Sequence, residues 1–339
     1  IKAGHNYNAE TRAAVYEWFC MHFKSEFPPI RNPAPVCVEA KSLGDLRVFP
    51  DRMLPENALS AWQIMDNWEK MSEQAYASLL PKSKADWDRF AGTIRGKLRT
   101  ILAVEVPAPE DIRFELGRIG SKIGESPEYA AVTIGRKGKS DAVLIETFTP
   151  RTVTSKECIL LIAPEDAGLN NSTQPLAQEW YEQGYRVYRV HGYASGEYRI
   201  PKKTYDSFRW SSAYNRDNTM NAVQDIVTAM AYIRNVNPGA PLNVVGLDEC
   251  GLPAALACAV SGMADDAVID LDGCDPAYDG EMLALTPWGA FNRIGGFRTA
   301  ALLLMNKPIT IMNAGATFDR EWYGNMAKIM GMEGNVKVQ

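Results

Sequence analysis

Apolar and polar residues follow two different patterns along the chain, and the change lies near residue 114. Before that point apolar side chains recur at the spacing of a helix with one buried face. This spacing predicts helices over residues 9–23, 56–80 and 84–102. Between the first two helices the sequence is irregular and rich in proline, which is typical of a linker or a wrapping segment. The pattern therefore predicts a helical and irregular N-terminal extension.

From residue 114 onward, short apolar runs predict strands. The first three, over residues 114–119, 130–136 and 141–148, are separated by glycine and charged residues and are predicted to be antiparallel. Strands and helices then alternate, with strands predicted over residues 158–163, 185–190, 242–245, 267–271, 308–312 and 335–338. Because near-continuous apolar strands bounded by helices are buried on both faces, the pattern predicts an α/β fold with a doubly wound, mostly parallel sheet.

Composition and charge exclude several function classes. The chain has 339 residues, 46% of them hydrophobic and 23% charged, which is ordinary for a globular protein. Its net charge of −5 argues against a nucleic-acid partner, which needs clustered basic residues. No apolar run reaches the roughly 18 residues of a membrane span. None of the six cysteines forms a Cys-Xaa-Xaa-Cys pair, and we expect neither a metal site nor a cofactor.

One strand end carries the pattern of a catalytic turn. In open α/β sheets, ligands bind beyond the carboxyl ends of the strands. After the strand predicted over residues 242–245 comes Gly246-Leu247-Asp248-Glu249-Cys250-Gly251, followed by a helix of small residues. This is the setting of a nucleophile elbow, a strained strand-to-helix turn that needs small neighbours. Aligning Gly246 with the first elbow glycine places Asp248 at the nucleophile and Cys250 at the second glycine. No Gly-Xaa-Ser-Xaa-Gly occurs in the chain.

From about residue 114 to its end the chain resembles the acetylxylan-esterase-like branch of the α/β-hydrolase superfamily. The shared features are the Pro-Glu-Asp-Ala-Gly loop at residues 164–168, the Gly-Tyr-Ala-Ser-Gly-Glu loop at residues 192–197, the long helix after it and the elbow. Gly4-His5-Asn6-Tyr7-Asn8 and the helix that follows resemble the catalytic-histidine loop and closing helix of such esterases. That segment normally ends a hydrolase domain, whereas here it begins the chain.

The resemblance implies a tandem protein. Residues 1–23 would be the tail of an upstream hydrolase domain, residues 24–113 a linker and helical docking segment, and residues 114–339 a second α/β-hydrolase-like domain. His5 would be the general base of the upstream domain, whose nucleophile and acid would precede residue 1. The implied partners are that upstream domain and a polysaccharide or small ester, and family habit favours a secreted or periplasmic protein.

The second domain departs from the family pattern. Asp248 stands in place of serine, and no histidine follows His191, although the family's base follows the last strand. An aspartate can form a covalent ester, but a histidine-activated water must then hydrolyse it. We therefore predict that this domain is catalytically degenerate and Asp248 inert. A non-catalytic scaffold, a glycan-binding pseudoenzyme and an Asp-nucleophile hydrolase remain as alternatives.

Other polar residues at strand ends have mainly structural interpretations. His191 is interpreted as a histidine packed or hydrogen-bonded near the sheet edge, and Asp319 as the N-cap of a helix. Asp272 is interpreted as a turn residue or cap. Ser195 is a weak candidate for a displaced nucleophile because it lacks an elbow. Asp248 and Glu249 could bind a cation together with Glu165, Asp166 or Asp272, although no known metal loop has this spacing.

Overall fold

The chain divides into two units in the computed structural model, Ile1–Asp66 and Asn67–Gln339, called here the N-terminal and C-terminal units. The structure describes residues 4–24, 26, 28–33, 47–48, 55–119, 128–150, 152–164, 173–192, 216–275 and 289–339. The loops predicted to hold Glu165, Asp166 and Ser195 lie outside these residues.

Two helices occupy the described residues before position 80. Helix α1, Ala9–His22, agrees with the predicted helix. Asn8 caps it, because its side-chain oxygen accepts a hydrogen bond from the Thr11 backbone N–H at 2.9 Å. Helix α2, Ala61–Leu79, begins five residues later than the predicted start at residue 56. Ser60 and Gln63 cause this, since each side chain accepts a hydrogen bond from the other's backbone N–H.

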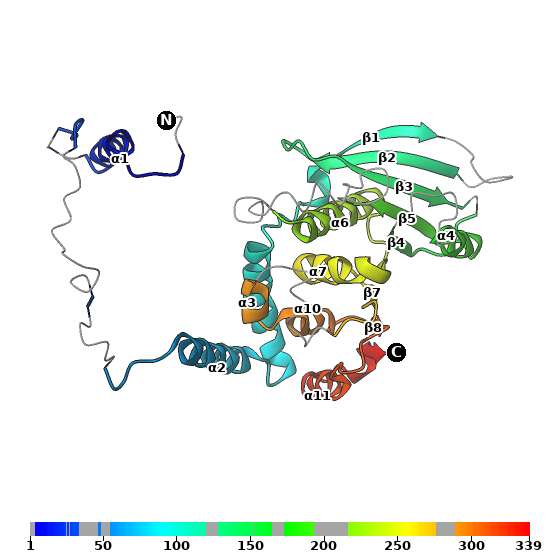
Figure 1. The fold of residues 1–339 in the computed structure, drawn as a ribbon. Helices are drawn as coiled ribbons and strands as arrows, with labels where there is room; N and C mark the ends of the chain where they lie inside the picture. The colour runs from blue at the N-terminus through cyan, green and yellow to red at the C-terminus, as the bar shows by residue number, and fades with distance from the viewer. Residues whose placement is uncertain are drawn as a thin grey trace. The chain divides into compact units, whose positions relative to one another are not determined.

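The described residues of the C-terminal unit form a nine-stranded sheet in the order β1-β2-β3-β5-β4-β6-β7-β8-β9 (Figure 1). The strands are β1 Ile112–Ile119, β2 Glu128–Arg136, β3 Val143–Thr149, β4 Cys158–Ile162, β5 Arg186–His191, β6 Leu242–Gly246, β7 Asp266–Asp270, β8 Ile309–Met312 and β9 Val336–Val338. Pairing is antiparallel from β1 to β5 and parallel from β5 to β9. The predicted mostly parallel α/β sheet is confirmed.

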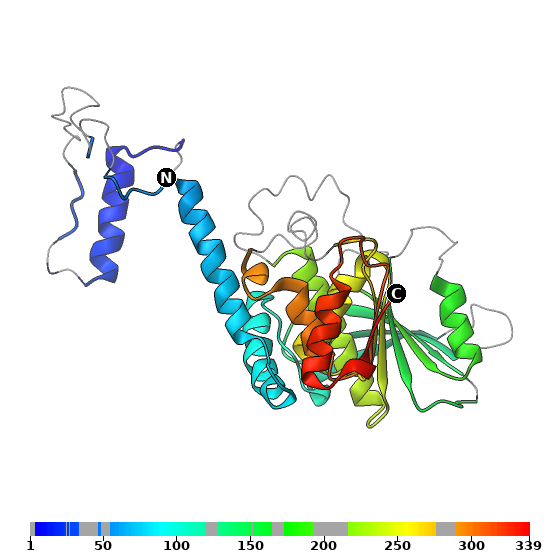
Figure 2. The same cartoon turned by 90° about the horizontal axis from the view of Figure 1, so that it is seen from below.

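Helices cover both faces of this sheet. They are α3 Lys84–Ile101, α4 Thr173–Glu182, α6 Asn218–Val236, α7 Gly251–Ser261, α9 Gly289–Arg293, α10 Gly296–Leu304 and α11 Arg320–Met330, with 3₁₀ turns at Pro109–Asp111, Asp248–Cys250 and Glu333–Asn335. Helices α6, α7 and α10 lie on one side and α4 on the other (Figures 1 and 2). All five residues of β4 are buried, as its continuous apolar run predicts for a strand covered on both faces.

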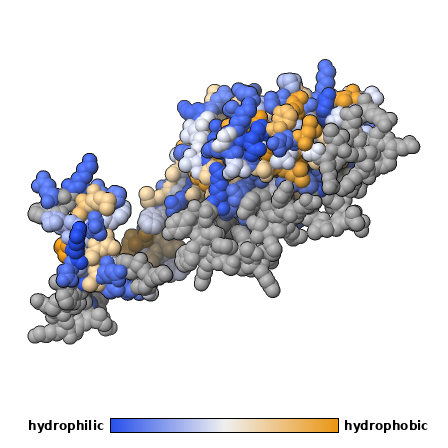
Figure 3. All heavy atoms as spheres, turned by 90° about the horizontal axis from the view of Figure 1, so that it is seen from above, coloured by the Kyte–Doolittle hydropathy of each residue, from blue (hydrophilic) through white to orange (hydrophobic). Residues whose placement is uncertain are grey.

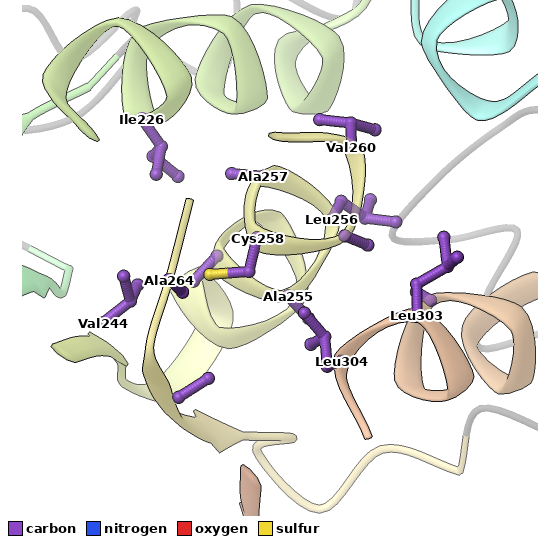
Figure 4. Packing of buried hydrophobic residues seen from close by; sticks show 14 of the residues in the cluster. Ile226, Val244, Ala255, Leu256, Ala257, Cys258, Val260, Ala264, Leu303 and Leu304 are labelled. Carbon is purple, nitrogen blue, oxygen red and sulfur yellow. The ribbon is translucent and has the colours of Figure 1, made fainter. Parts of the chain in front are cut away.

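Helix α7 packs at the centre of the larger core cluster. Nine of its eleven residues are buried, and most of these are Ala, Gly or Cys. Small side chains let α6, α10 and the sheet approach α7 closely, and Figure 4 shows Ile226, Val244 and Leu303 around it. Cys258 is fully buried there, and burial raises the pKa of its thiol to about 12. It therefore acts as a small hydrophobic side chain.

Helix α3 is part of the C-terminal unit's core. Its apolar face is buried, through Trp87, Phe90, Ala91, Ile94 and Leu98. The Trp87 indole Nε1–H donates to the Leu302 carbonyl at 3.0 Å, which fixes α3 against α10. The unit begins at Asn67, so the boundary predicted at residue 113 falls within it. The division into 1–23, 24–113 and 114–339 remains a prediction about evolutionary domains.

The edge strand β1 carries both exposed apolar and charged side chains. Phe114 is 47% exposed and Leu116 63% exposed, and they alternate with charged residues such as Arg113 and Glu115. The described residues in the view of Figure 3 likewise mix hydrophilic and hydrophobic side chains. Charges on an edge strand discourage its pairing with another sheet.

Candidate functional site

The turn after β6 has the geometry of a nucleophile elbow. Leu247 still belongs to the sheet, because its backbone N–H donates to the Ile162 carbonyl of β4 at 2.9 Å. Asp248 then adopts φ +48°, a left-handed conformation that is strained for a residue with a Cβ. A 3₁₀ turn over Asp248–Cys250 leads directly into α7. Asp248 is therefore the central residue of a sharp strand-to-helix turn.

Gly246 and Gly251, on either side of Asp248, lie so close to neighbouring atoms that neither position has room for a side chain. A Cβ on Gly246 would lie 2.5 Å from the Ala254 Cβ, and one on Gly251 would lie 1.7 Å from the Asp270 carbonyl oxygen. Real Cβ atoms do not approach other atoms so closely. Gly251, one residue after Cys250, is therefore the second position that must lack a side chain. The turn keeps the packing of an elbow without its serine.

Strained residues recur at the two neighbouring strand ends. Asp272 after β7 and Asn313 after β8 both have φ +50°, so three of the five described non-glycine residues with positive φ lie at this edge of the sheet. Aspartate and asparagine are the residues that tolerate this conformation best after glycine. Strain of this kind clusters at functional sites. The three strained residues therefore lie together at the carboxyl ends of the strands, where ligands bind in open α/β sheets.

A buried carboxylate holds these strand ends together. Asp270 is 5% exposed. The Asn313 side-chain N–H donates to its two oxygens at 3.0 and 2.9 Å, and the Asp272 backbone N–H donates to Oδ1 at 2.8 Å. We refer to Asp270, Asp272 and Asn313 as the strand-end clamp. The sequence did not single out Asp270 or Asn313, because their pairing depends on β7 and β8 being neighbours.

The elbow is an unfavourable place for a nucleophile. The pKa of Asp248 is raised by burial and by the nearby charges of Asp270 and Asp272. The pKa of Cys250 is raised to about 12 by burial and by Glu249 and Asp248. A protonated thiol is a poor nucleophile, so Cys250 does not replace the missing serine. The electrostatics of the turn disfavour the charged form of both side chains.

The His191 side chain contacts Glu146. It lies at the end of β5, is 8% exposed, and its Nε2 lies 3.0 Å from Oε2 of Glu146. Arg189 Nε lies 3.3 Å from the same Glu146 oxygen. The structural interpretation of His191 agrees with this packing. His191 is the last residue of β5, so it lies where the strands end, although β5 itself is an interior strand between β3 and β4.

The other predicted acids have structural contacts. Asp319 caps α11, accepting a hydrogen bond from the Trp322 backbone N–H at 2.9 Å, which confirms the predicted N-cap. Its other oxygen lies 3.5 Å from Arg298. Asp272 is a turn residue, as predicted. Within the described residues no group of three or more His, Cys, Asp or Glu side chains is placed to hold a metal ion.

His5 lies in the N-terminal unit, in a loop held by local hydrogen bonds. The Asn6 side chain donates to the Gly4 carbonyl at 2.6 Å and accepts from the Asn8 backbone N–H at 3.0 Å. Arg12 donates to the Tyr7 carbonyl at 2.6 Å. His5 itself is exposed. A short, ordered loop thus presents an imidazole at the N-terminus of α1.

The strand order, the crossovers and the elbow together define the class: the C-terminal unit has the α/β-hydrolase fold. Known structures agree. A candidate acetyl xylan esterase from Bacteroides fragilis NCTC 9343 is similar with a TM-score of 0.61 and 13% sequence identity, over 84% of each chain. The methylesterase BT1017 is similar with a TM-score of 0.57 and 15% identity, over 80% of this chain and 63% of the methylesterase.

At these identities the likeness shows the fold alone, and the chain spans less than two thirds of the methylesterase. The sequence matches no model of a protein family and no curated protein. None of the helices in the described part of the chain has both the length and the apolar character that a membrane span requires.

Proposed function

We propose that this chain is part of an acetylxylan-esterase-like ester hydrolase whose chemistry takes place in a domain preceding residue 1, while the C-terminal unit is not catalytic. One observation supports the proposal that the C-terminal unit is not catalytic. His191 is the only histidine in residues 67–339, and it is paired with Glu146. Strand β4 lies between His191's strand and the elbow strand. The His191 ring contacts Glu146 of β3, which lies on the opposite side of β5 from β4 and the elbow strand, so its Nε2 is directed to a different neighbour than Asp248.

His5 is the proposed base of the upstream domain. Its loop is already ordered by Asn6, Asn8 and Arg12, which suits a residue that must meet a nucleophile in one orientation. Helix α1 supports this proposal, since its large apolar side chains are exposed: Trp18 is 53% exposed, Phe19 46% and Phe23 75%. Exposed apolar stripes of this kind mark surfaces that pack on another domain.

Helix α2 is the proposed docking element of the linker segment. Trp62 is 78% exposed, Met65 54%, Trp68 64% and Met71 65%, and no residue of the helix is buried. These residues recur at helical spacing. In the tandem protein they would pack against the upstream hydrolase domain.

The proposed chemistry is acyl transfer. A serine of the upstream domain would attack the ester carbonyl while His5 takes its proton, and backbone N–H groups would stabilise the oxyanion. The substrate would be an ester of a polysaccharide or a small ester. The ester-cleaving names of the two similar folds agree with this class of substrate.

Two assays with p-nitrophenyl acetate test the proposal. The chain of residues 1–339 should hydrolyse it no faster than the Asp248→Ala variant does. A longer protein that includes the preceding residues should be active, and His5→Ala should lower kcat by about 10³-fold or more. His22→Ala is the matched control, because His22 is an exposed histidine of the same unit. Turnover by residues 1–339 that Asp248→Ala abolishes would show the C-terminal unit to be an enzyme.

An Asp-nucleophile hydrolase is the second candidate, and the φ of +48° at Asp248 favours it. The raised pKa of Asp248 and the lack of a histidine beside it count against it. Denaturing the chain during incubation with the ester and weighing it by mass spectrometry decides between them. Attack of the Asp248 carboxylate on p-nitrophenyl acetate would expel p-nitrophenolate and leave an acetyl group on Asp248 as a mixed anhydride. That added acetyl group would support the second candidate, and an unchanged mass supports the first.

A further inference from the structure

The open edge of β1 has backbone hydrogen-bonding groups that no described strand uses. β1 is the outermost strand on its side of the sheet (Figure 1). Its regular pairing with β2 runs from Ile112 to Leu116, and the register shifts beyond Leu116. The Lys137 backbone N–H donates to the Asp111 carbonyl at 2.8 Å, which makes these two residues a hydrogen-bonded pair of the ladder. Because hydrogen-bonded and non-hydrogen-bonded pairs alternate, Ile112, Phe114 and Leu116 direct their N–H and C=O groups to the open edge.

The side chains of this regular segment alternate between the two faces of the sheet. Phe114 lies on the face that α6 covers, since its ring centroid is 5.6 Å from that of Tyr232. Phe114 and Leu116 are nevertheless 47% and 63% exposed. Arg113 and Glu115 lie on the opposite face. Within the described part of the chain neither of these two is in an ion pair. The edge therefore presents apolar groups on one face and two charges of opposite sign on the other.

A second copy of β1 fits this pattern. Antiparallel pairing about a twofold axis through Phe114 places this residue opposite its own copy, as a hydrogen-bonded pair. Arg113 then lies opposite Glu115 of the second copy, and Glu115 opposite Arg113 of the second copy. These are non-hydrogen-bonded pairs, in which side chains lie closest together. Ile112 lies opposite Leu116, so apolar residues also meet. An axis through Glu115 or Arg113 would instead bring like charges together.

The same charges oppose other partners. Charged residues on an edge strand discourage its pairing with strands of unrelated sequence, because like charges placed directly opposite each other are destabilising. The Arg113 guanidinium donates to the Asp141 carbonyl, which holds the side chain on this face without neutralising its charge. Complementary charges thus favour a second copy of the strand over other strands.

We propose that β1 pairs with β1 of a second copy of this chain, in register about Phe114, so that two nine-stranded sheets form one continuous sheet. The pairing uses the open hydrogen-bonding groups and covers part of the exposed surface of Phe114 and Leu116. The regular segment is short, so the association is expected to be weak and reversible. The proposal does not depend on the proposed ester hydrolysis.

Sedimentation equilibrium of the full chain tests the proposal. The dimer population should rise with protein concentration. Arg113→Glu and Glu115→Arg each place two pairs of like charges across the twofold axis, and each should weaken the dimer by roughly tenfold or more. Mixing the two variants restores both pairs of opposite charges, so a heterodimer should form about as tightly as the parent dimer. Glu321→Arg is the matched control, because it makes the same charge change at an exposed residue of α11 and should leave the dimer unchanged.

A second pair of variants tests the backbone hydrogen bonds. Phe114→Pro removes an N–H directed to the open edge, at a kind of position where proline is tolerated, and should abolish the dimer. Phe114→Ala keeps the N–H and should only weaken the dimer. Circular dichroism checks that all the variants retain the fold.

Three results would overturn the proposal. The first is a monomer at about 0.5 mM protein, where even a Kd of about 0.1 mM would give mostly dimer. The second is a dimer that survives both charge reversals, which would place the contact elsewhere on the chain. The third is a mixture of the two reversal variants that associates no more tightly than either variant alone.

Discussion

At the scale of single residues, the turn after β6 has the backbone constraints of a nucleophile elbow with an aspartate at its centre. Asp248 retains a left-handed φ of +48°, and Gly246 and Gly251 remain where a Cβ would collide with neighbouring atoms. These constraints come from packing the start of α7 against β6 and β7. They persist because the fold needs them, whether or not the turn carries chemistry.

Gly251→Ala should therefore be strongly destabilising. The new Cβ would lie 1.7 Å from the Asp270 carbonyl oxygen, so backbone must move, and we expect a loss of about 2–4 kcal/mol in the free energy of unfolding. Gly96→Ala on α3 is the control, since nothing lies within 4 Å of its Cβ position. It should stabilise by about 0.5–1 kcal/mol. Urea denaturation measures both, and equal effects would contradict the contact argument.

Asp248 should make stability depend on pH. Asp248 is exposed, but partial desolvation at the turn and the charges of Asp270 and Asp272 raise its pKa in the folded chain above the ordinary value of 3.8. A raised carboxyl pKa means that the folded state binds the proton more tightly. The resulting stabilisation is present below the unfolded pKa and is lost as pH rises through the folded pKa.

The variant Asp248→Asn should remove this loss, so that it gains stability over the parent protein as pH rises from below 3.8 towards neutrality. The gain should be small, because solvent screens an exposed carboxylate. Thermal unfolding at a series of pH values measures it. Glu249→Gln is the neighbouring control, and a parent-to-variant difference that does not change with pH would be evidence against the electrostatic cause.

At the scale of secondary-structure elements, the sequence predicts the burial pattern within a strand or helix, but it does not predict which strands are neighbours. The unbroken apolar run of β4 predicted a strand buried on both faces, and all five residues are buried. The apolar run at residues 300–305 does not by itself distinguish a strand from a helix, because a short run has no diagnostic period. In the structure residues 300–304 belong to α10, Gly296–Leu304, and Met305 is its C-cap.

Contacts between neighbouring strands explain why the sequence does not predict the roles of Asp270, Asn313 and Glu146. The contact between Asp270 and Asn313 joins residues 43 positions apart, and nothing local to either residue indicates the other. Glu146 was missed for the same reason, since it meets His191 only because β3 and β5 are neighbours. The elbow was found because all its residues lie within one short segment.

The strand-end clamp should couple β7 to β8. Asp270→Ala leaves the Asn313 amide and the Asp272 N–H without their acceptor, and we expect a loss of about 2–3 kcal/mol. In a double-mutant cycle with Asn313→Ala, the coupling energy should be about 1–2 kcal/mol. The pair Asp270→Ala and Asp319→Ala serves as control, because Asp319 caps α11 and should show no coupling. If the losses in the free energy of unfolding from Asp270→Ala and Asn313→Ala are additive, the contact between the two side chains does not couple β7 to β8.

At the scale of the whole molecule, the hydrolase fold and the sequence resemblance to it begin at different places. The resemblance starts near residue 114, whereas the C-terminal unit starts at Asn67 and includes α3. Helix α3 precedes residue 114, so the sequence resemblance assigns it to the linker and docking segment. One face of α3 nevertheless supplies four large buried side chains to the core, those of Trp87, Phe90, Ile94 and Leu98.

Truncation separates these two boundaries. A protein of residues 67–339 retains α3, so it should unfold cooperatively with a Tm within a few degrees of that of the parent. A protein of residues 114–339 exposes the surface that α3 covers. The four large α3 side chains contribute about 1.5–3 kcal/mol each, or roughly 6–12 kcal/mol together, which matches the whole stability of a typical domain.

The shorter protein should therefore fail to give a cooperative transition in circular dichroism. Ile94→Asp in the full chain provides an independent check, because it places an unpaired charge at a fully buried position without changing the chain length. It should also abolish the transition, while Lys97→Asp on the exposed face of α3 should not. If residues 114–339 unfold cooperatively near the parent Tm, α3 is an accessory of the hydrolase core, and the boundary lies where the resemblance begins.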